Sequence, residues 1–139
     1  MVLVDTSVWS LALRRRPRNL SREERHLVDE WKKLVKDGRA VLIGPIRQEI
    51  LSGLRKQSTF ESLRGLLRSF RHLEIEPSDY DRAAEFFNQC RARGVSGGPV
   101  DLLISSVAHR LDVPVFTTDP DFERYAQHVP IKLHELHEP

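Results

Sequence analysis

Hydrophobic residues along this chain alternate between short unbroken runs and stripes at helical spacing. The unbroken runs predict short buried strands, and they lie at residues 2–4, 41–43, 73–75, 113–116 and 131–133. Between them, apolar residues recur every three or four positions, which predicts amphipathic helices over residues 21–36, twice within 45–71 and twice within 79–111. This alternation predicts one α/β domain over residues 1–139, with an open, parallel, doubly wound sheet flanked by helices.

The helix stripes also predict which side chains form the core. In the segment YDRAAEFFNQC, one helix face is formed by Tyr80, Ala83, Ala84, Phe87 and Cys90. We expect this face to be buried, and we expect Trp9 to pack in the core as well. The glycine-rich stretch at 94–99 predicts the end of one helix and the start of the next.

The composition is that of an ordinary single domain. With 139 residues, of which 40% are hydrophobic, the chain can bury a core without disulfides or metals to stabilise it. Its one cysteine excludes an intramolecular disulfide and is typical of a reducing compartment. No apolar segment has the length of a membrane span or the pattern of a secretion signal, so we expect a soluble cytoplasmic protein that does not act at a membrane.

Charge is divided unevenly along the chain. Residues 1–73 carry sixteen Lys and Arg against eight Asp and Glu, whereas residues 74–139 carry six against twelve. A basic half favours a polyanionic partner, and its densest stretch contains Arg14, Arg15, Arg16 and Arg18. The alternative is a solvated helix surface with ion pairs, because two glutamates follow this stretch.

Two aspartates follow predicted strands directly. Asp5 comes after the first strand, and Asp119 follows the strand at 113–116 in VPVFTTDPDF. Carboxyl ends of parallel strands meet at one edge of a sheet, which is where such sheets bind ligands. Each aspartate also has a structural interpretation, because Asp5 could cap the next helix, and Asp119 before a proline could cap the last one. Asp121 could complement the dipole of that last helix.

Two further acids lie on helix faces that also carry apolar residues. In PIRQEILSGL, Glu49 shares a face with Ile46 and Ile50, where an idle surface acid is not expected. Asp101 extends the stripe of Ile104 toward the start of its helix, so its phase points it inward. A first-turn acid could also be present for the helix dipole alone.

Four carboxylates in one crevice would repel one another and lose hydration. Either some of them bind protons or a cation lies among them, and oxygen ligands favour Mg²⁺ or Mn²⁺. Such an ion activates water and stabilises charge on a phosphoryl group, so acids and a basic half together point to phosphodiester hydrolysis. The histidines form no competing metal site, and we expect His134 and His137 in a solvated tail.

Four short segments, VDTSVW, PIRQEIL, PVDLLISSVAHR and VFTTDPDF, carry these acids in order. They resemble the four acidic motifs of PIN-domain nucleases, specifically the VapC-type toxins of toxin–antitoxin systems, and the resemblance covers essentially the whole chain. It implies a catalytic, metal-binding quartet for Mg²⁺ or Mn²⁺ formed by Asp5, Glu49, Asp101 and Asp119. It also implies auxiliary roles for Thr117 and Asp121, and Thr6 could form a hydrogen bond near the metal or cap its helix.

The resemblance further implies metal-dependent endoribonuclease activity on RNA. The expected partners are a cognate VapB-type antitoxin, which lays a segment across the active-site groove, and a second copy in a homodimer. The four arginines at 14–16 and 18 are then candidate contacts to the RNA backbone, and Phe122 and Tyr125 could stack a base. The alternative is a catalytically inactive PIN-like module that binds RNA or protein.

Overall fold

The computed structural model describes residues 1–136 of the chain. In this part it contains four strands, β1 (Val2–Val4), β2 (Ala40–Leu42), β3 (Arg71–His72) and β4 (Val115–Phe116). Its helices are α1 (Thr6–Leu13), α2 (Arg22–Lys36), α3 (Gly44–Leu51), α4 (Gln57–Leu67), α5 (Pro77–Ala92), α6 (Pro99–Leu111) and α7 (Asp121–Ala126). A short 3₁₀ turn, η1 (Pro17–Asn19), separates α1 from α2.

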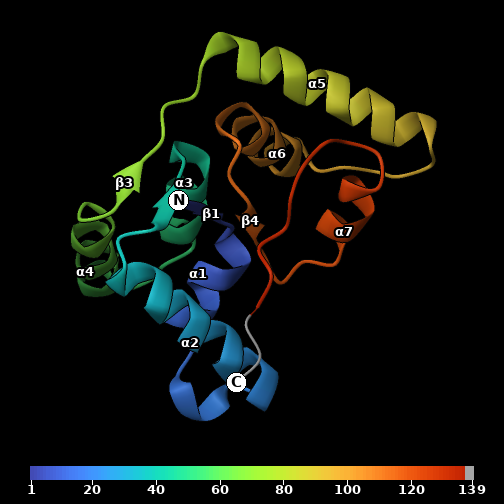
Figure 1. The fold of residues 1–139 in the computed structure, drawn as a ribbon. Coiled ribbons are helices and arrows are strands. Elements are labelled where there is room, and N and C mark those ends of the chain that lie inside the picture. Colours follow the sequence, from blue (N-terminus) through green and yellow to red (C-terminus); the bar gives the residue numbers. More distant parts are fainter. Residues whose placement is uncertain (137–139) are drawn as a thin grey trace.

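The four strands form one parallel sheet in the order β3-β2-β1-β4. The chain winds outward from β1 to β3 and then crosses back to place β4 on the other side of β1. Crossovers between parallel strands are right-handed, so connections that run in opposite directions across the sheet lie on opposite faces. The connections from β1 to β3 therefore place α1–α4 on one face, and the return from β3 to β4 places α5–α6 on the other. Figure 1 shows α5 and α6 above the sheet and α1 and α2 below it. The predicted fold class is confirmed.

β1 coincides with its apolar run and β4 is shorter than the run at 113–116, whereas the other runs do not match the strands exactly. The run at 73–75 does not form a strand, because β3 precedes it and only Leu73 continues the pairing, with its N–H 2.8 Å from Leu42 O. The run at 131–133 forms a single bridge between Leu133 and Val115. The strand at 41–43 begins and ends one residue earlier. An apolar run marks burial, whereas the neighbouring strand decides which backbone groups pair.

The buried face of α5 differs from the predicted one. Its buried residues are Asp79, Ala83, Phe86 and Cys90. Tyr80 is 56% exposed, and with Ala84 and Phe87 it lines an apolar groove of about 460 Å³ between α5 and the start of α6. The prediction was wrong for Tyr80 and Ala84, whereas Phe87 is partly buried against the core, and Ala83 and Cys90 are buried as predicted. Two overlapping stripes have helical spacing, and the structure buries the one that contains an aspartate.

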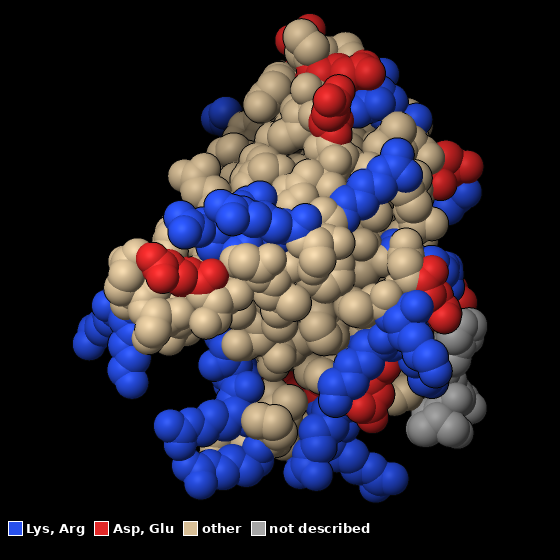
Figure 2. Space-filling view, turned by 90° about the vertical axis from the view of Figure 1, so that its left-hand side faces the viewer, with Lys and Arg blue, Asp and Glu red and all other residues tan. Residues whose placement is uncertain are grey.

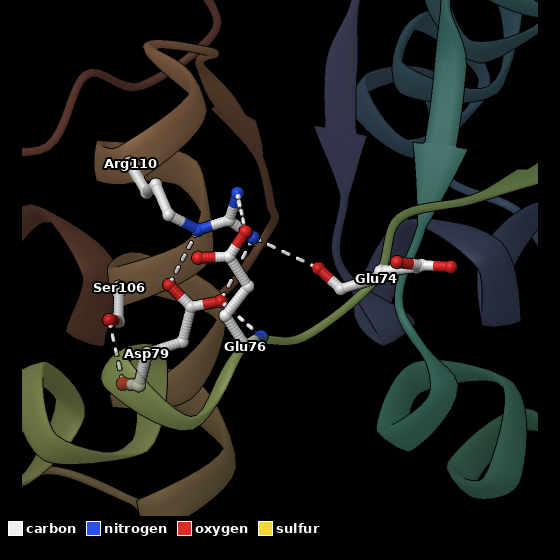
Figure 3. Close-up of polar contacts among 5 residues, drawn as sticks. All are labelled: Glu74, Glu76, Asp79, Ser106 and Arg110. Carbon is white, nitrogen blue, oxygen red and sulfur yellow. Dashed lines mark hydrogen bonds and ion pairs between the residues drawn. The ribbon is translucent and has the colours of Figure 1, made fainter.

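Asp79 is buried because it is fully paired. Its carboxylate accepts hydrogen bonds from Arg110 Nε and Nη2, both at 2.9 Å, and from the Glu76 N–H at 2.8 Å. Figure 3 shows Arg110 reaching from α6 across this carboxylate, while the Ser106 hydroxyl donates to the Asp79 carbonyl at 2.8 Å. Burial alone raises the pKa of Asp79, but the hydrogen bonds from Arg110 and Glu76 outweigh it, so the pKa lies below its usual value. This network joins α5 to α6.

Trp9 closes the core beneath β1, as predicted. Its ring is fully buried and packs edge-to-face on Trp31, with centroids 5.6 Å apart, and on Phe70, with centroids 4.9 Å apart. Its indole N–H donates to Val4 O at 2.9 Å, which satisfies the last carbonyl of β1. The point at which β1 ends is therefore held by a core side chain.

The C-terminal segment is not the solvated tail that the sequence predicted. The His134 side chain is 8% exposed, and its Nε2 lies 2.9 Å from Oε1 of the equally buried Glu30 on α2. Its backbone N–H donates to Val115 O at 2.8 Å, so this segment is fastened to both β4 and α2. His137, the other half of that prediction, lies outside the described residues. Within the described residues, no helix has the length and apolar character of a membrane span.

Replacing Asp79 with asparagine should strongly destabilise the fold. Removing the charge of the buried carboxylate leaves Arg110 with Glu76, an exposed acid 3.4 Å away, as its ion-pair partner. We therefore expect the free energy of unfolding to fall by about 3 kcal/mol, measured by urea denaturation. The matched control is Asp112→Asn, which breaks an ion pair to Lys132 of equal 2.9 Å length between exposed side chains. That variant should lose less than about 0.5 kcal/mol. Equal losses in the two variants would contradict the role assigned to Asp79.

Candidate active site

Asp5 stands at the junction of β1 and α1. It occupies the N-cap position of α1, yet its side chain makes no capping hydrogen bond. Instead, Oδ2 accepts hydrogen bonds from the Ser7 hydroxyl at 2.8 Å and the Thr117 hydroxyl at 2.9 Å. The residue is 7% exposed. The interpretation of this side chain as a helix cap is therefore wrong, and two hydroxyl groups hold the carboxylate at the edge of the sheet.

These hydroxyls bind the ends of β1 and β4 together. The Asp5 N–H donates to Phe116 O at 2.8 Å, which brings the two strand ends side by side. The Thr118 N–H donates to Ser7 Oγ and the Asp119 N–H to Thr117 Oγ1, each at 3.0 Å. The sequence did not identify Ser7 as a partner of Asp5. Its position two residues after Asp5 was visible, but its pairing with the β4 loop was not.

Asp119 lies in the same loop, with a role in helix capping as well. Its Oδ1 accepts the Asp121 N–H at 2.9 Å, so the capping interpretation holds for one of its two oxygens. Asp121 pairs with Arg124 at 2.9 Å on the exposed side of α7. The Asp119 carboxylate thus stays within the loop that follows β4, whereas Asp121 has an ion-pair partner of its own.

Glu49 approaches from α3. Its side chain is exposed, although Ile46 and Ile50 on the same helix are buried, so it lies at the edge of the buried face. The Thr6 hydroxyl donates to Glu49 Oε2 at 3.0 Å and so connects α3 to the start of α1. Thr6 therefore bonds to an acid and not to the backbone of its own helix.

Asp101 is half-buried in the first turn of α6. Its Oδ2 accepts a hydrogen bond from the Tyr125 hydroxyl at 2.9 Å. Burial, together with the charges of Asp5, Asp119 and Asp121, raises the pKa of Asp101 to about 6, against the lowering effect of the hydrogen bond from Tyr125. The charges that act on Asp101 are therefore those of Asp5, Asp119 and Asp121, and Glu49 is not among them.

The acids do not form a closed cage. In residues 1–136, no group of three or more His, Cys, Asp or Glu side chains is close enough to form a ready-made metal site. The candidate acids and the hydroxyls bonded to them supply the hard oxygen donors that Mg²⁺ and Mn²⁺ prefer. Mg²⁺ also keeps several water ligands, so an open set of acids suits it. Acids at a switch point of a parallel sheet are the pattern on which the sequence resemblance rests.

The comparison with protein families settles the membership. The PIN domain family matches residues 2–127, which is nearly the whole chain. The chain belongs to the PIN domain family. Whether the domain extends over the full 1–139 stays a prediction.

Known proteins similar to this PIN domain include a ribonuclease and several solved structures. Ribonuclease VapC11 of Mycobacterium tuberculosis is 29% identical over 129 residues, which cover 91% of this chain and 92% of the relative. FitAcB from Neisseria gonorrhoeae has a TM-score of 0.74 and 20% identity, covering 97% of each chain. VapBC2 from Rickettsia felis, bound to a DNA fragment from their promoter, has a TM-score of 0.74 at 16% identity, covering 96% and 98%. These structural likenesses show the fold.

Two of the arginines after α1 line a groove that reaches the residues flanking Asp5 and Asp119 in this PIN domain. Arg14 and Arg15 line a groove of about 520 Å³ between α1 and α2, which Ser7 and Thr118 also line. All four arginines of the stretch are exposed. Figure 2 shows Lys and Arg side chains gathered at the lower end of the molecule, where Figure 1 places the segment between α1 and α2. A basic groove therefore adjoins Ser7, which holds Asp5.

The rings of Phe122 and Tyr125 are not exposed at the surface. Both side chains are 0% exposed, and their rings pack edge-to-face with centroids 5.2 Å apart. The expectation that they stack a base is therefore wrong, because a nucleobase cannot reach a ring buried in the core. Their short spacing from the acids in sequence reflects the small size of α7 and not a shared surface.

The raised pKa of Asp101 gives a pH dependence that can be measured without metal. Between pH 3.8, the usual pKa of the carboxyl, and about pH 6, Asp101 is more protonated in the folded protein than in the unfolded chain. The stability that this carboxyl contributes is therefore lost as the pH rises. Asp101→Asn should therefore be more stable than the wild type at neutral pH, by about 1–2 kcal/mol after solvent screening, and nearly equal below about pH 4. Urea denaturation in EDTA across this range measures the difference.

Asp81→Asn, which removes an exposed charge from α5, is the control for the loss of a single carboxylate. A difference between Asp101→Asn and the wild type that stays constant from pH 4 to 8 would contradict the burial assigned to Asp101.

Proposed function

We propose that this PIN domain is an endoribonuclease that uses Mg²⁺ or Mn²⁺ to hydrolyse RNA phosphodiester bonds, as the toxin of a VapBC-type toxin–antitoxin system. The observation that carries the proposal is the carboxylate of Asp5, which two hydroxyls hold at the switch point of the sheet and which caps no helix. The name of the relative VapC11, a ribonuclease similar over nearly its whole length, supports the activity.

We assign the metal-ligating and catalytic roles to Asp5, Glu49, Asp101 and Asp119, with auxiliary roles for Thr6, Thr117 and Asp121. A bound divalent ion supplies an activated water and neutralises charge on the scissile phosphate. Ser7 and Thr117 orient Asp5 by occupying Oδ2, and no hydrogen bond within the described residues occupies its Oδ1. Asp119 is similarly held at one oxygen, by the N–H of Asp121.

The basic groove supplies the binding surface for the substrate. Arg14 and Arg15 line it directly, and Arg16 and Arg18 follow on exposed backbone. An RNA backbone along these arginines would pass Ser7 and Thr118 and so reach the acids. The arginines therefore contribute affinity, whereas the acids carry the chemistry.

We infer a VapB-type antitoxin as the protein partner. Similar structures include VapBC2 of Rickettsia felis and VapBC of Salmonella typhimurium, whose names pair the toxin fold with an antitoxin. A homodimer and a cytoplasmic location stay predictions from the sequence. The alternative function, an inactive module that binds RNA or protein, predicts binding of RNA without cleavage, and the first experiment below distinguishes it.

Replacing Asp5 with asparagine should abolish most RNA cleavage while the fold survives. The variant removes one ligand charge but keeps the shape, so we expect a loss of about 100-fold or more, corresponding to about 3 kcal/mol of transition-state stabilisation. Cleavage of a labelled RNA by the wild type should also stop in excess EDTA. Circular dichroism checks the fold, and Asp81→Asn on α5 is the matched control. Full activity in EDTA would exclude metal dependence, and binding without cleavage by the wild type would favour the inactive module.

Replacing Arg14, Arg15 and Arg16 with glutamine should weaken RNA binding and its dependence on salt. Each lost phosphate contact should reduce the slope of log K against log salt concentration by about 0.7 for single-stranded RNA, measured by fluorescence anisotropy with the Asp5→Asn protein as background. The control replaces Lys32, Lys33 and Lys36 on α2, which are equally exposed and remove the same charge. If the arginine variant bound RNA with wild-type affinity and wild-type salt dependence, the assignment of these arginines to RNA would be contradicted. If the variant also lost binding to the antitoxin, the stretch would be assigned to the interface with that partner.

A further inference from the structure

The Tyr125 side chain on α7 is fully buried, and its hydroxyl is its one polar group. It donates its proton to Asp101 Oδ2 at 2.9 Å and accepts the N–H of Gly98 at 3.4 Å. A buried phenol usually has a hydrogen-bond partner, but this one bridges two functional parts of α6, its N-cap residue and its first-turn acid. The ring is held by Phe122 and by complete burial, so the hydroxyl has a defined position.

The glycine loop before α6 holds the same carboxylate from another side. A Cβ on Gly98 would lie 3.3 Å from Asp101 Oδ2, and a Cβ on Gly97 would lie 2.7 Å from Leu102 Cδ2 and 3.5 Å from the Tyr125 ring. The backbone at Gly98 therefore lies tightly against the Asp101 carboxylate, and the backbone at Gly97 lies at ordinary contact distance from the Tyr125 ring. Asp101 is enclosed between this loop and Tyr125, which leaves its side chain little rotational freedom.

We propose that Tyr125 is a positioning residue that presents Asp101 to the divalent ion, an inference that rests on the proposed function. The hydroxyl occupies Oδ2, whereas Oδ1 accepts no hydrogen bond within the described residues and is the oxygen left for coordination. A hydrogen bond to a ligating carboxylate fixes its orientation and so contributes to metal affinity without touching the metal. Ser7 and Thr117 hold Asp5 in the same way, and Thr6 donates to Glu49, so hydroxyl groups bond to three of the four acids.

The alternative is that Tyr125 only stabilises the packing of α7 on α6. That role would lower the free energy of unfolding on loss of the hydroxyl but would leave metal affinity unchanged. A matched control exists on α6, because Ser106 also donates a buried side-chain hydrogen bond, to Asp79 O at 2.8 Å, and belongs to the Asp79 network and not to the acids. Comparing the two hydroxyl deletions separates stabilisation of the fold from positioning.

The experiment measures Mn²⁺ binding to the full chain by isothermal titration calorimetry at neutral pH. The proteins compared are the wild type, Tyr125→Phe, Ser106→Ala and Asp101→Asn, with urea denaturation of each in EDTA. Tyr125→Phe should bind Mn²⁺ about tenfold more weakly, as is typical when a partner of a metal ligand is removed. Ser106→Ala should bind like the wild type although its stability falls.

The outcomes separate this inference from the proposed function. Wild-type affinity in Tyr125→Phe, with weakened binding in Asp101→Asn, would overturn the positioning role and leave the metal site standing. Unchanged binding in Asp101→Asn would remove Asp101 from the ligands and overturn the inference with it. A wild type that binds no Mn²⁺ would overturn both the metal site and the inference. Equal weakening in Ser106→Ala would assign the effect to helix packing and also overturn it.

A second measurement keeps the natural hydroxyl in place and serves if Tyr125→Phe does not fold. The chain has two tyrosines, and Tyr80 is exposed, so in Tyr80→Phe the signal of ¹³Cζ-labelled tyrosine comes from Tyr125 alone. Adding diamagnetic Mg²⁺ should shift this resonance in parallel with binding, because coordination changes the charge on the carboxylate that accepts the hydrogen bond. A resonance unmoved at saturating Mg²⁺ would contradict the proposal.

Discussion

Parallel pairing of β1 with a strand on each side is the constraint on which the rest of the structure depends. All three β1 residues are fully buried, and the strand lies between β2 and β4, which come from opposite directions of chain winding. The reversal leaves the carboxyl ends of β1 and β4 adjacent, so Asp5 and Thr117 meet although 112 positions separate them. The Trp9 indole N–H bonds to the last carbonyl of β1, which fixes the residue at which the strand ends and Asp5 follows.

Two aspartates on α5 and α6 show how their surroundings separate structural from functional acids. Asp79 is fully buried, yet Arg110 and a backbone N–H more than offset the effect of burial and lower its pKa. Asp101 has a single hydroxyl donor and other acids nearby, so burial raises its pKa to about 6. A carboxylate left without a cationic partner is destabilising unless a cation binds, which is why such groups mark candidate sites. The same chemical group thus stabilises the packing of α5 on α6 at Asp79 and marks a candidate site at Asp101.

The fold was predictable because burial and periodicity are local properties of the sequence. Alternating apolar runs and helical stripes predicted a parallel α/β sheet, and the first strand lies where the pattern put it. The errors at β3 and at residues 131–133 arose because strand pairing is a property of two segments, and one segment cannot show which of its residues has a neighbour. The error at Tyr80 has a similar origin, since Asp79 is buried only through an arginine 31 positions away.

Two of the candidate acids, Asp5 and Asp119, could be placed from the sequence alone, because an aspartate after a buried strand occurs at the edge of the sheet whatever the details of packing. Glu49 and Asp101 lie on helices and were proposed from the phase of their helix faces. The surroundings of these acids could not be predicted. Only the tertiary structure decided that Asp5 binds two hydroxyls and caps no helix, that Glu49 is exposed, that Tyr125 is buried against Asp101, and that His134 is paired with Glu30. Each of these depends on contacts between segments distant in sequence. Residue type and spacing determine which groups are available for chemistry, whereas long-range packing determines the partner and the degree of burial that set how each group behaves.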